Sequence, residues 1–209
     1  TDLDGDGWTD LFVSNDNGAN MLFRNLGTGK FANEAMIRAV AFGAGGKPQS
    51  NMGIASGDYD RDQDQDVLVT TFANEPFTLY QNEGSYFSDV SAVVGLAAPT
   101  YVPLGFGTMF LDVDQNGWLD LFFANGHVEQ YINQRSTTQT FAQANQLFLA
   151  NGKGGFTDAP TALPADARRV HRAVAAQGLA VVGAQQEERA PAGDQVARHH
   201  ALLAHEEQR

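Results

Sequence analysis

The sequence predicts an all-β chain made of repeated units, and three observations support this prediction. An acidic nine-residue pattern begins at Asp2 and recurs at Asp58 and Asp112, so the copies start 56 and 54 residues apart. Short apolar runs bounded by Gly, Asn or Asp accompany each copy, as expected for strands joined by turns. No long pattern with the 3.6-residue period of a helix appears in residues 1–166. Self-similarity at a fixed period is typical of repeat architectures.

Each copy of the acidic pattern predicts a strand directly after it. These strands are the apolar runs Leu11–Val13, Val67–Val69 and Leu121–Phe123. A strand is also expected before the second and third copies, at residues 52–57 and 105–111. The acidic pattern therefore forms the loop between two neighbouring strands of a hairpin.

Two more strands are expected in every unit, on either side of a glycine-containing turn. The first of the two lies in residues 20–25, 77–82 and 146–151, and a short aromatic segment forms the second. Four short strands per unit are typical of a β-propeller blade. One blade cannot bury both faces of its sheet, so it needs neighbours. The aromatic segments are residues 30–33, 86–89 and 155–158.

The repeats therefore predict a β-propeller fragment of about three four-stranded blades. The blades are expected at about residues 1–50, 51–105 and 106–166. The first blade lacks its opening strand, and three blades do not close a ring of the usual four to eight. We therefore expect the remaining blades to belong to a longer parent chain.

An atypical C-terminal tail is expected over residues 167–209. All the aromatic residues of the chain precede it, and it contains no Asp-x-Asp sequence. Two interpretations stay open. The tail is either a helical or disordered appendage, or an out-of-frame translation that replaces a fourth blade. The second is favoured because the change occurs where the next repeat is due.

The acidic pattern places side-chain oxygens at positions 1, 3, 5 and 9 of a short loop. Carboxylates this close repel each other unless a hard cation lies among them, and six to eight oxygens at roughly 2.3–2.6 Å are what Ca²⁺ binds. Position 7 is expected to supply a backbone carbonyl. The candidate metal ligands are Asp2, Asp4, Asp6, Trp8 and Asp10 in loop one, Asp58, Asp60, Asp62, Asp64 and Asp66 in loop two, and Asp112, Asp114, Asn116, Trp118 and Asp120 in loop three.

These loops differ from the EF-hand, which needs a glutamate at position 12 and flanking helices. Position 12 is instead Val13, Val69 or Phe123, and strands follow. A calcium loop on a β-hairpin is therefore predicted. We expect calcium to be structural here, because it neutralises the loop and supports the hairpin.

The three loops are not equivalent. Position 6 favours glycine because the tight turn needs a positive φ. Loops one and three have Gly7 and Gly117 there, but loop two has Gln63, so strain is expected in loop two. Loop three carries the neutral Asn116 at position 5 and is expected to bind calcium more weakly.

The composition excludes some classes of function. The formal net charge of −12 argues against nucleic acid as a partner. No apolar stretch approaches the ~18 residues that a membrane span needs. Calcium affinities of roughly 10⁻⁴–10⁻³ M are usual for extracellular modules, and such sites stay empty in the cytosol. An extracellular or periplasmic location is therefore expected.

The three loops resemble the Asp-x-Asp-x-Asp-Gly-x-x-Asp calcium sites of FG-GAP/VCBS repeats, the blades of integrin α-subunit propellers. The resemblance is greatest to bacterial FG-GAP/VCBS proteins that carry an ASPIC/UnbV-type C-terminal domain, through residues 53–60, 118–127 and 145–148. It covers nearly all of the three repeats and none of the tail, and it does not include the ASPIC/UnbV domain. It implies a secreted calcium propeller of the seven-bladed type with adhesion or recognition roles. The pattern departs from the family at Gln63 and Asn116.

No catalytic residues are assigned from the sequence, and the chain is expected not to be an enzyme. His127, Glu129 and Asp120 are candidates for an acid–base site, but a solvated or capping role for His127 is the favoured interpretation. The favoured function is recognition of a protein or glycan. The third unit contains extra residues, roughly 126–144, which form either a partner surface or a tolerated insertion. The alternative functions are a propeller domain of a secreted enzyme and a scaffold for another catalytic domain.

Overall fold

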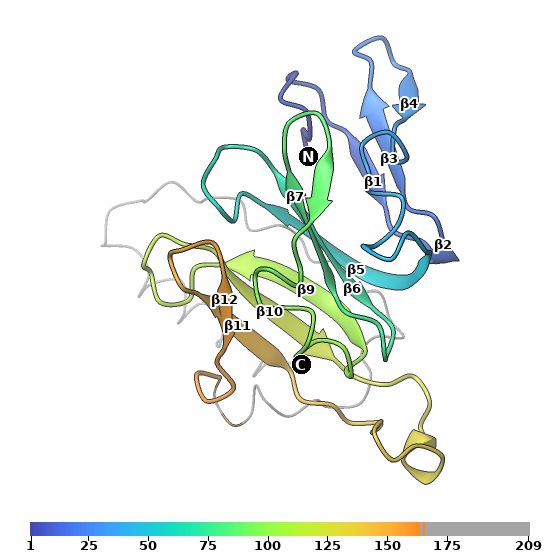
Figure 1. The fold of residues 1–209 in the computed structure, drawn as a ribbon, viewed down its shortest axis with the longest axis vertical. Coiled ribbons are helices and arrows are strands. Elements are labelled where there is room, and N and C mark those ends of the chain that lie inside the picture. The colour runs from blue at the N-terminus through green and yellow to red at the C-terminus, as the bar shows by residue number, and fades with distance from the viewer. Residues whose placement is uncertain (164, 166–209) are drawn as a thin grey trace, which may run out of the picture. The chain divides into compact units, whose positions relative to one another are not determined.

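The computed structural model describes residues 1–163 and 165, and these form three antiparallel sheets (Figure 1). The all-β prediction is confirmed, and the sheets have the arrangement of propeller blades. The expected tail, residues 167–209, lies outside the described residues. Sheet one contains β1 (Leu11–Val13), β3 (Met21–Asn25) and β4 (Phe31–Asn33); sheet two contains β2 (Asp16–Gly18), β5 (Gln49–Gly57), β6 (Asp66–Thr71), β7 (Thr78–Asn82) and β8 (Phe87–Asp89); sheet three contains β9 (Gly105–Leu111), β10 (Asp120–Asn125), β11 (Gln146–Ala150) and β12 (Phe156–Asp158).

The strand order within the sheets follows the chain, as expected for blades. Sheet three has the order β12-β11-β10-β9, and β5 to β8 form a similar antiparallel series in sheet two. The exception is β2, which follows β1 in the chain but pairs with β5 at the edge of sheet two. The sequence gives no strand signal there, because Asp16-Asn-Gly18 has low β-propensity. Its pairing with β5 extends sheet two with a segment of the first repeat.

Strand β6 shows how the sheets pack on one another. Successive side chains of a strand point to opposite faces. Val67 and Val69 accordingly belong to a core cluster with Leu22 of sheet one, whereas Leu68 belongs to a cluster with Phe123 of sheet three. All six residues of β6 are buried. The middle sheet is therefore covered on both faces by its neighbours, which is what the repeat argument requires.

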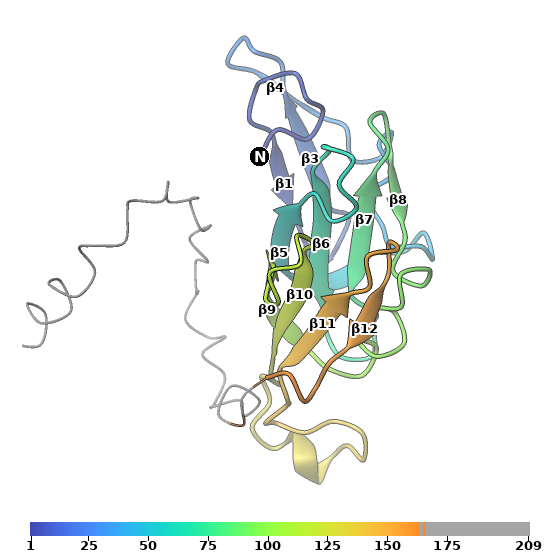
Figure 2. The ribbon, with the colours of Figure 1, turned by 90° about the vertical axis from the view of Figure 1, so that its left-hand side faces the viewer.

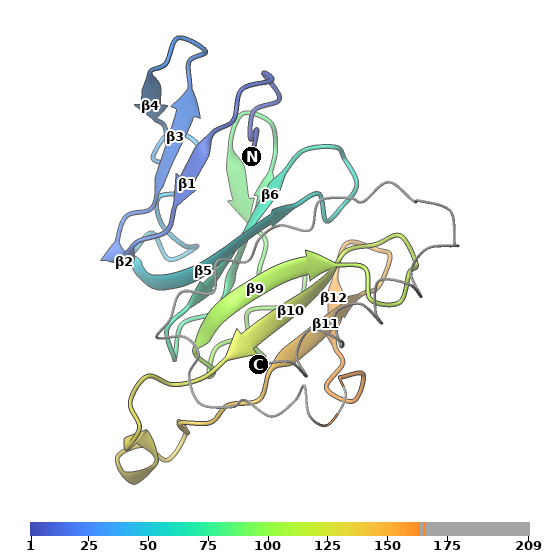
Figure 3. The same ribbon diagram turned by 180° about the vertical axis from the view of Figure 1, so that it is seen from behind.

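Glycines allow the first strands of sheets two and three to approach closely. Strands β5 and β9 lie side by side (Figure 3). A Cβ atom on Gly53 of β5 would lie 2.2 Å from the carbonyl oxygen of Phe106 in β9. A Cβ atom on Gly105 would lie 2.4 Å from the ring of Phe77. Only glycine fits at these two positions.

The acidic loops and the extra residues of the third unit lie at opposite ends of the sheets (Figure 2). Each acidic loop precedes or joins the first two strands of its unit, while residues 126–144 join β10 to β11. This segment contains a short 3₁₀ helix, η1 (Ile132–Gln134). Within the described residues, no helix is long and apolar enough to cross a membrane.

Candidate metal centres

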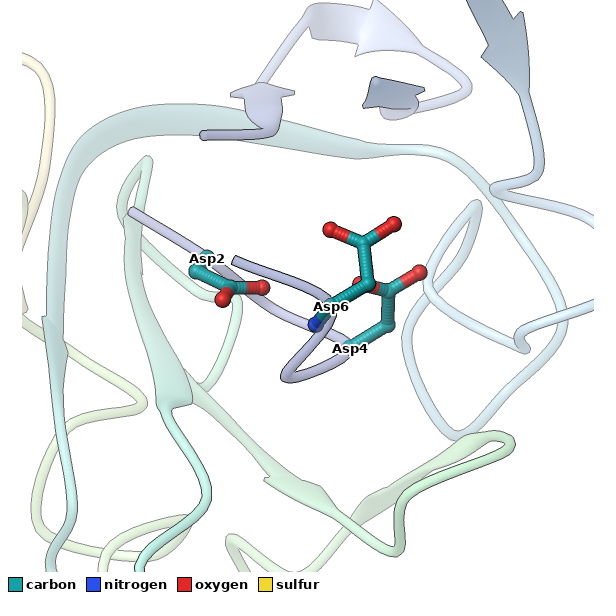
Figure 4. A group of neighbouring side chains, drawn as sticks. All are labelled: Asp2, Asp4 and Asp6. Atoms are coloured by element: carbon teal, nitrogen blue, oxygen red, sulfur yellow. The ribbon is translucent and has the colours of Figure 1, made fainter. Parts of the chain in front are cut away.

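Each acidic loop gathers carboxylate groups at one point. In each triad, one oxygen from every member lies within 4.8 Å of those of the others. Figure 4 shows loop one, where the carboxylates of Asp4 and Asp6 lie beside each other and Asp2 lies across the turn. The triads are Asp2, Asp4 and Asp6; Asp58, Asp60 and Asp62; and Asp112, Asp114 and Asp120.

The aspartate at position 1 closes the loop in all three copies. Both of its carboxylate oxygens accept backbone N–H groups from further along the loop. In loop one Asp2 accepts hydrogen bonds from Gly5 at 2.9 Å and Gly7 at 2.8 Å. The corresponding bonds join Asp58 to Asp62 and Gln63, and Asp112 to Asn116 and Gly117. These bonds curl the backbone around the position where a cation would lie.

The residue at position 5 makes the same contact whether or not it is charged. The side-chain oxygen of Asp6 accepts the N–H of Trp8 at 2.9 Å, and Asn116 accepts that of Trp118 at 2.8 Å. Asn116 therefore keeps the loop conformation and removes one negative charge. This supports the prediction of weaker cation binding in loop three without testing it.

The backbone of the loops has the conformation that the sequence predicted at position 6. The φ angles are 88° at Gly7, 80° at Gln63 and 86° at Gly117, so the positive φ predicted for position 6 is confirmed, including at the non-glycine Gln63. The sequence reasoning missed a second such position. Position 4 is also left-handed, with φ of 68° at Arg61 and 58° at Gln115. Non-glycine residues in this region are unfavourable by about 1–2 kcal/mol.

The aspartate at position 9 has a structural role that the sequence reasoning did not identify. Asp10, Asp66 and Asp120 are all buried. In each case one carboxylate oxygen accepts the N–H of position 2 and the other accepts an N–H at the end of the third strand. The bonds to Asp66 come from Tyr59 at 3.0 Å and Asn82 at 2.8 Å. The corresponding donors are Leu3 and Asn25 for Asp10, and Val113 and Ala150 for Asp120.

Burial disfavours the negative charge of three loop carboxylates, whereas at Asp2 burial is outweighed by backbone N–H groups, chiefly those of Gly7 and Gly5, and the pKa is lowered. Burial raises the pKa of Asp66 to about 7, although two backbone N–H groups act in the opposite direction. Burial and the neighbouring Asp62 raise the pKa of Asp60. Burial also raises the pKa of Asp4, with the Asp10 and Asp6 charges adding to it. A cation among these groups would favour the ionised forms.

The donor atoms fit calcium. All the side-chain donors are oxygens, which a hard cation prefers. The buried Oδ1 of Asp60 has no hydrogen-bond partner in the structure, and a buried carboxylate oxygen without one is costly. Each carboxylate oxygen has lone pairs to spare after it accepts one N–H, so the position 1 and position 9 oxygens remain available to a cation.

The position 7 tryptophans of loops one and three pack on glycines outside their loops. The Trp8 ring lies over Gly27, where an added Cβ would be 2.8 Å from Nε1. The Trp118 ring lies near Gly152 in the same way, and the Arg61 guanidinium lies 5.2 Å from its centroid. These contacts join loops one and three to the turns between the third and fourth strands of their units, whereas position 7 of loop two is Asp64, whose N–H donates to Asp62. The predicted use of the position 7 carbonyl stays a prediction.

The prediction of a solvated His127 side chain is wrong. The residue is buried, its ring packs edge-on against Phe72 at 5.6 Å, and its Nδ1 accepts the N–H of Glu129 at 3.0 Å. The capping part of the prediction is correct, and burial against Phe72 is what the sequence could not show. Asp120 begins β10 and His127 follows its end, so they lie roughly 20 Å apart at about 3.3 Å per residue. The Glu129 carboxylate pairs instead with Arg135 at 2.6 Å. The structure therefore does not assemble the considered acid–base site.

Comparison with known proteins agrees with the loops and the sheets. Residues 2–69, from loop one to β6, match the FG-GAP-like repeat. Cartilage acidic protein 1 of Homo sapiens is 30% identical over 146 residues, which are 67% of this chain and 19% of that protein. The Mus musculus protein of the same name gives the same identity and coverage. The chain spans about a fifth of the length of the curated relatives it matches. It therefore contains an FG-GAP-like repeat and is a distant homologue of cartilage acidic protein 1.

Proposed function

We propose that residues 1–166 are calcium-binding FG-GAP/VCBS blades, of the kind found in bacterial ASPIC/UnbV-associated proteins, that present a recognition surface. The observation that carries the proposal is the common geometry of loops one, two and three. Each gathers three carboxylates within 4.8 Å, and each holds its backbone by equivalent hydrogen bonds to positions 1, 5 and 9. All three clusters contain the aspartates of positions 1 and 3, completed by position 5 in loops one and two and by position 9 in loop three, which favours one common ligand.

Calcium in these loops would be structural. The loops are the links between the first two strands of each blade, and their position 9 aspartates also hold the third strand. Bound calcium supplies positive charge that offsets the repulsion among the carboxylates. The chain's own residues fix the loop shape, the hairpin and the attachment to the third strand.

Thermal unfolding of the full chain in a calcium titration tests the metal claim. Calcium at a free concentration ten times the dissociation constant of one site stabilises the folded state by about 1.4 kcal/mol. We expect a rise in the melting temperature between 0.1 and 10 mM calcium, since roughly 10⁻⁴–10⁻³ M is the affinity range of extracellular modules. Magnesium is the control, because it demands a smaller octahedral site. An unchanged melting temperature at 10 mM calcium rules out the proposal.

An extracellular or periplasmic location follows from the same affinity range. Sites of this strength fill where calcium is millimolar and stay empty where it is submicromolar. The supporting features are the partly exposed triads of loops one and two. Localisation of the tagged parent protein by cell fractionation tests this part, and a cytosolic protein contradicts it.

The proposed partner surface is the segment that joins β10 to β11. Its side chains Val128 and Tyr131 are more than half exposed. The segment also lines an open pocket of about 370 Å³, where hydroxyl and amide side chains such as Thr138 and Gln143 alternate with apolar ones such as Val102 and Ala142, and Asp158 lies at its wall. A lining that mixes hydrogen-bonding and apolar groups suits a glycan or a polar protein segment.

A binding screen tests this surface. Glycan and extracellular-protein arrays are probed with the full chain, with and without a calcium chelator. Tyr131→Ser is the test variant because its ring is exposed, and Tyr86→Ser is the matched control because Tyr86 lies at the opposite end of the sheets. Equal loss of binding in both variants contradicts the assignment of this surface.

Absence of catalysis is part of the proposal. Its support is that His127 is buried and bonded to backbone, so it is not available as a general base at the surface. Hydrolase assays on the same glycan and peptide collections check this. Turnover that a chelator abolishes would favour the alternative of an enzyme domain.

Further blades in a longer parent chain are also proposed, because one face of sheet one lacks a cover. Leu11, Val13 and Phe31 are 50%, 39% and 45% exposed. The residues in the corresponding places of sheet two, which are covered by sheet one, are Val67, Val69 and Phe87, with 1%, 0% and 2% exposed. A preceding blade would bury the first set in the same way.

The substitution Leu11→Lys tests this interface. In this chain it should leave the melting temperature within the range of ordinary surface changes. In a longer chain that includes the preceding residues of the gene, it should lower the free energy of unfolding by about 2 kcal/mol or more, because it places a charge in an apolar interface. Equal effects in the two chains contradict the proposal.

A further inference from the structure

One register position beside the acidic loops differs sharply among the three units. Leu11, the residue after Asp10, pairs with Phe23 of β3, and the equivalent pairs in the other units are Val67–Tyr80 and Leu121–Phe148. Each position 9 aspartate immediately precedes the first member of its pair. The residues next along the third strand are therefore equivalent too, and they are Arg24, Gln81 and Leu149.

Arg24 lies among the loop one carboxylates. Its Nε lies 3.8 Å from Oδ2 of Asp4, and its Nη1 lies 4.0 Å from Oδ2 of Asp6. The same Nε donates a hydrogen bond to Glu34 at 2.8 Å. The guanidinium is therefore held by Glu34 at the edge of the triad, where its charge acts on two candidate ligands of the cation.

The other two units have no cation in this position. The Nε2 of Gln81 donates a hydrogen bond to Oδ2 of Asp60 at 2.7 Å, and Tyr59 orients that amide by donating to its Oε1 at 3.1 Å. Leu149 has an apolar side chain that offers the loop three carboxylates neither a charge nor a hydrogen bond. At this strand position, loop one therefore faces a positive charge, loop two a neutral hydrogen-bond donor, and loop three an apolar side chain.

We propose that this strand residue sets the calcium affinity of the loop beside it, and that Arg24 acts as a built-in competing cation in loop one. This rests on the calcium binding proposed above and adds a reason why the three loops differ in calcium affinity. Loop one has four aspartates, but the guanidinium offsets one of their charges. Loop three has three aspartates and a leucine at this strand position, and the Arg61 guanidinium packs on its Trp118 ring. Arg24 therefore offsets part of the charge that the fourth aspartate adds to loop one.

Glu34 has a defined part in this arrangement. It provides a second partner for the guanidinium, at a shorter distance than either loop carboxylate. Glu34 would hold the guanidinium if a cation bound to loop one displaced Arg24 from Asp4 and Asp6. Without Glu34 the guanidinium has only the loop carboxylates as partners, so calcium competes with it less well.

The two tryptophans of the chain allow calcium binding at loops one and three to be measured separately. Trp8 occupies position 7 of loop one, and Trp118 occupies position 7 of loop three. In a Trp118→Phe background, tryptophan fluorescence reports calcium binding near loop one. In a Trp8→Phe background it reports loop three. Both backgrounds are full-length chains, and calcium alone is the probe.

In the loop one reporter, Arg24→Leu should lower the calcium dissociation constant about tenfold, the effect expected for one unit charge at a few ångströms in a partly exposed site. Leucine is the residue that the third unit has in this register. Glu34→Gln should raise the dissociation constant. Arg135→Leu is the matched control, since it also removes one positive charge, from an exposed ion pair with Glu129 at the other end of the sheets. It should leave the constant unchanged.

The outcomes separate the inference from the proposal beneath it. If calcium changes the fluorescence and Arg24→Leu leaves the dissociation constant unchanged, the inference is overturned and calcium binding stands. An equal effect of Arg24→Leu in the loop three reporter also overturns it, because the effect would then be one of net charge. If neither reporter nor the melting temperature responds to calcium, the proposed function fails and this inference fails with it.

Discussion

Replacing Asp10 by asparagine removes one acceptor from a buried carboxylate that joins loop one to β3. The Oδ2 atom of Asp10 accepts the N–H of Leu3 at 2.9 Å, and Oδ1 accepts that of Asn25 at 2.8 Å. Asparagine has only one side-chain oxygen. One of the two backbone N–H groups would therefore face an NH₂ donor instead of an acceptor.

The size of the effect follows from these two bonds. A buried donor without an acceptor is unfavourable by about 1–3 kcal/mol, and a hydrogen bond to a charged group contributes about 1.5–3 kcal/mol. We expect Asp10→Asn to lower the free energy of unfolding by roughly 2–3 kcal/mol with no calcium present. The control is Asp6→Asn, because Asn116 accepts the equivalent N–H in loop three at 2.8 Å. It should change the free energy of unfolding by no more than about 0.5 kcal/mol without calcium.

Urea denaturation of the full chain, in chelator and in 5 mM calcium, measures both quantities. Asp10→Asn should lower the transition midpoint in both conditions. Asp6→Asn should lower it only in calcium, because it removes one ligand charge and leaves the loop conformation intact. If Asp10→Asn and wild type share one midpoint in chelator, the structural role assigned to position 9 is wrong.

Three other changes test separate features. Gln63→Gly should raise the free energy of unfolding by about 1 kcal/mol in urea titrations, because it relieves the backbone at φ 80°; the reverse change in loop three, Gly117→Gln, should lower it, and equal stabilities would refute the strain. Gly53→Ala should lower the same quantity by roughly 1–3 kcal/mol, since its Cβ would lie 2.2 Å from the carbonyl oxygen of Phe106. Burial raises the pKa of Asp66 to about 7 from 3.8, so the folded chain retains a proton that the unfolded chain loses. Without calcium, the urea midpoint should therefore fall as the pH rises from 5 to 8, and Asp66→Asn should reduce that fall; a midpoint that rises over this range contradicts the assignment.

Much of the fold could be predicted because the repeat, the alternation and the turn residues all point to one architecture. The run Val67–Val69 identified β6, and the four-strand order of sheets two and three followed from the acidic loops and glycine turns. The positive φ at Gln63 was predictable from the glycines that occupy the same position in loops one and three. These are local properties of the chain.

The features that could not be predicted depend on contacts between distant segments. Strand β2 has no propensity of its own and forms because β5 offers an edge 34 residues away, at Ser50 opposite Asp16. Residue order alone gives no sign that His127 packs against Phe72. The position 9 aspartates were recognised as oxygen donors, but their bonds to the third strand appear only when the hairpins are assembled.

Equilibrium dialysis of the full chain against labelled calcium tests the central claim most directly. The account predicts saturation at three calcium ions per chain, with dissociation constants of roughly 10⁻⁴–10⁻³ M. Removing the loop two ligands by Asp58→Ala and Asp62→Ala should reduce the saturating number to two. Binding of no calcium at 10 mM, or a number that the loop two substitutions leave unchanged, would contradict the assignment of calcium to these loops.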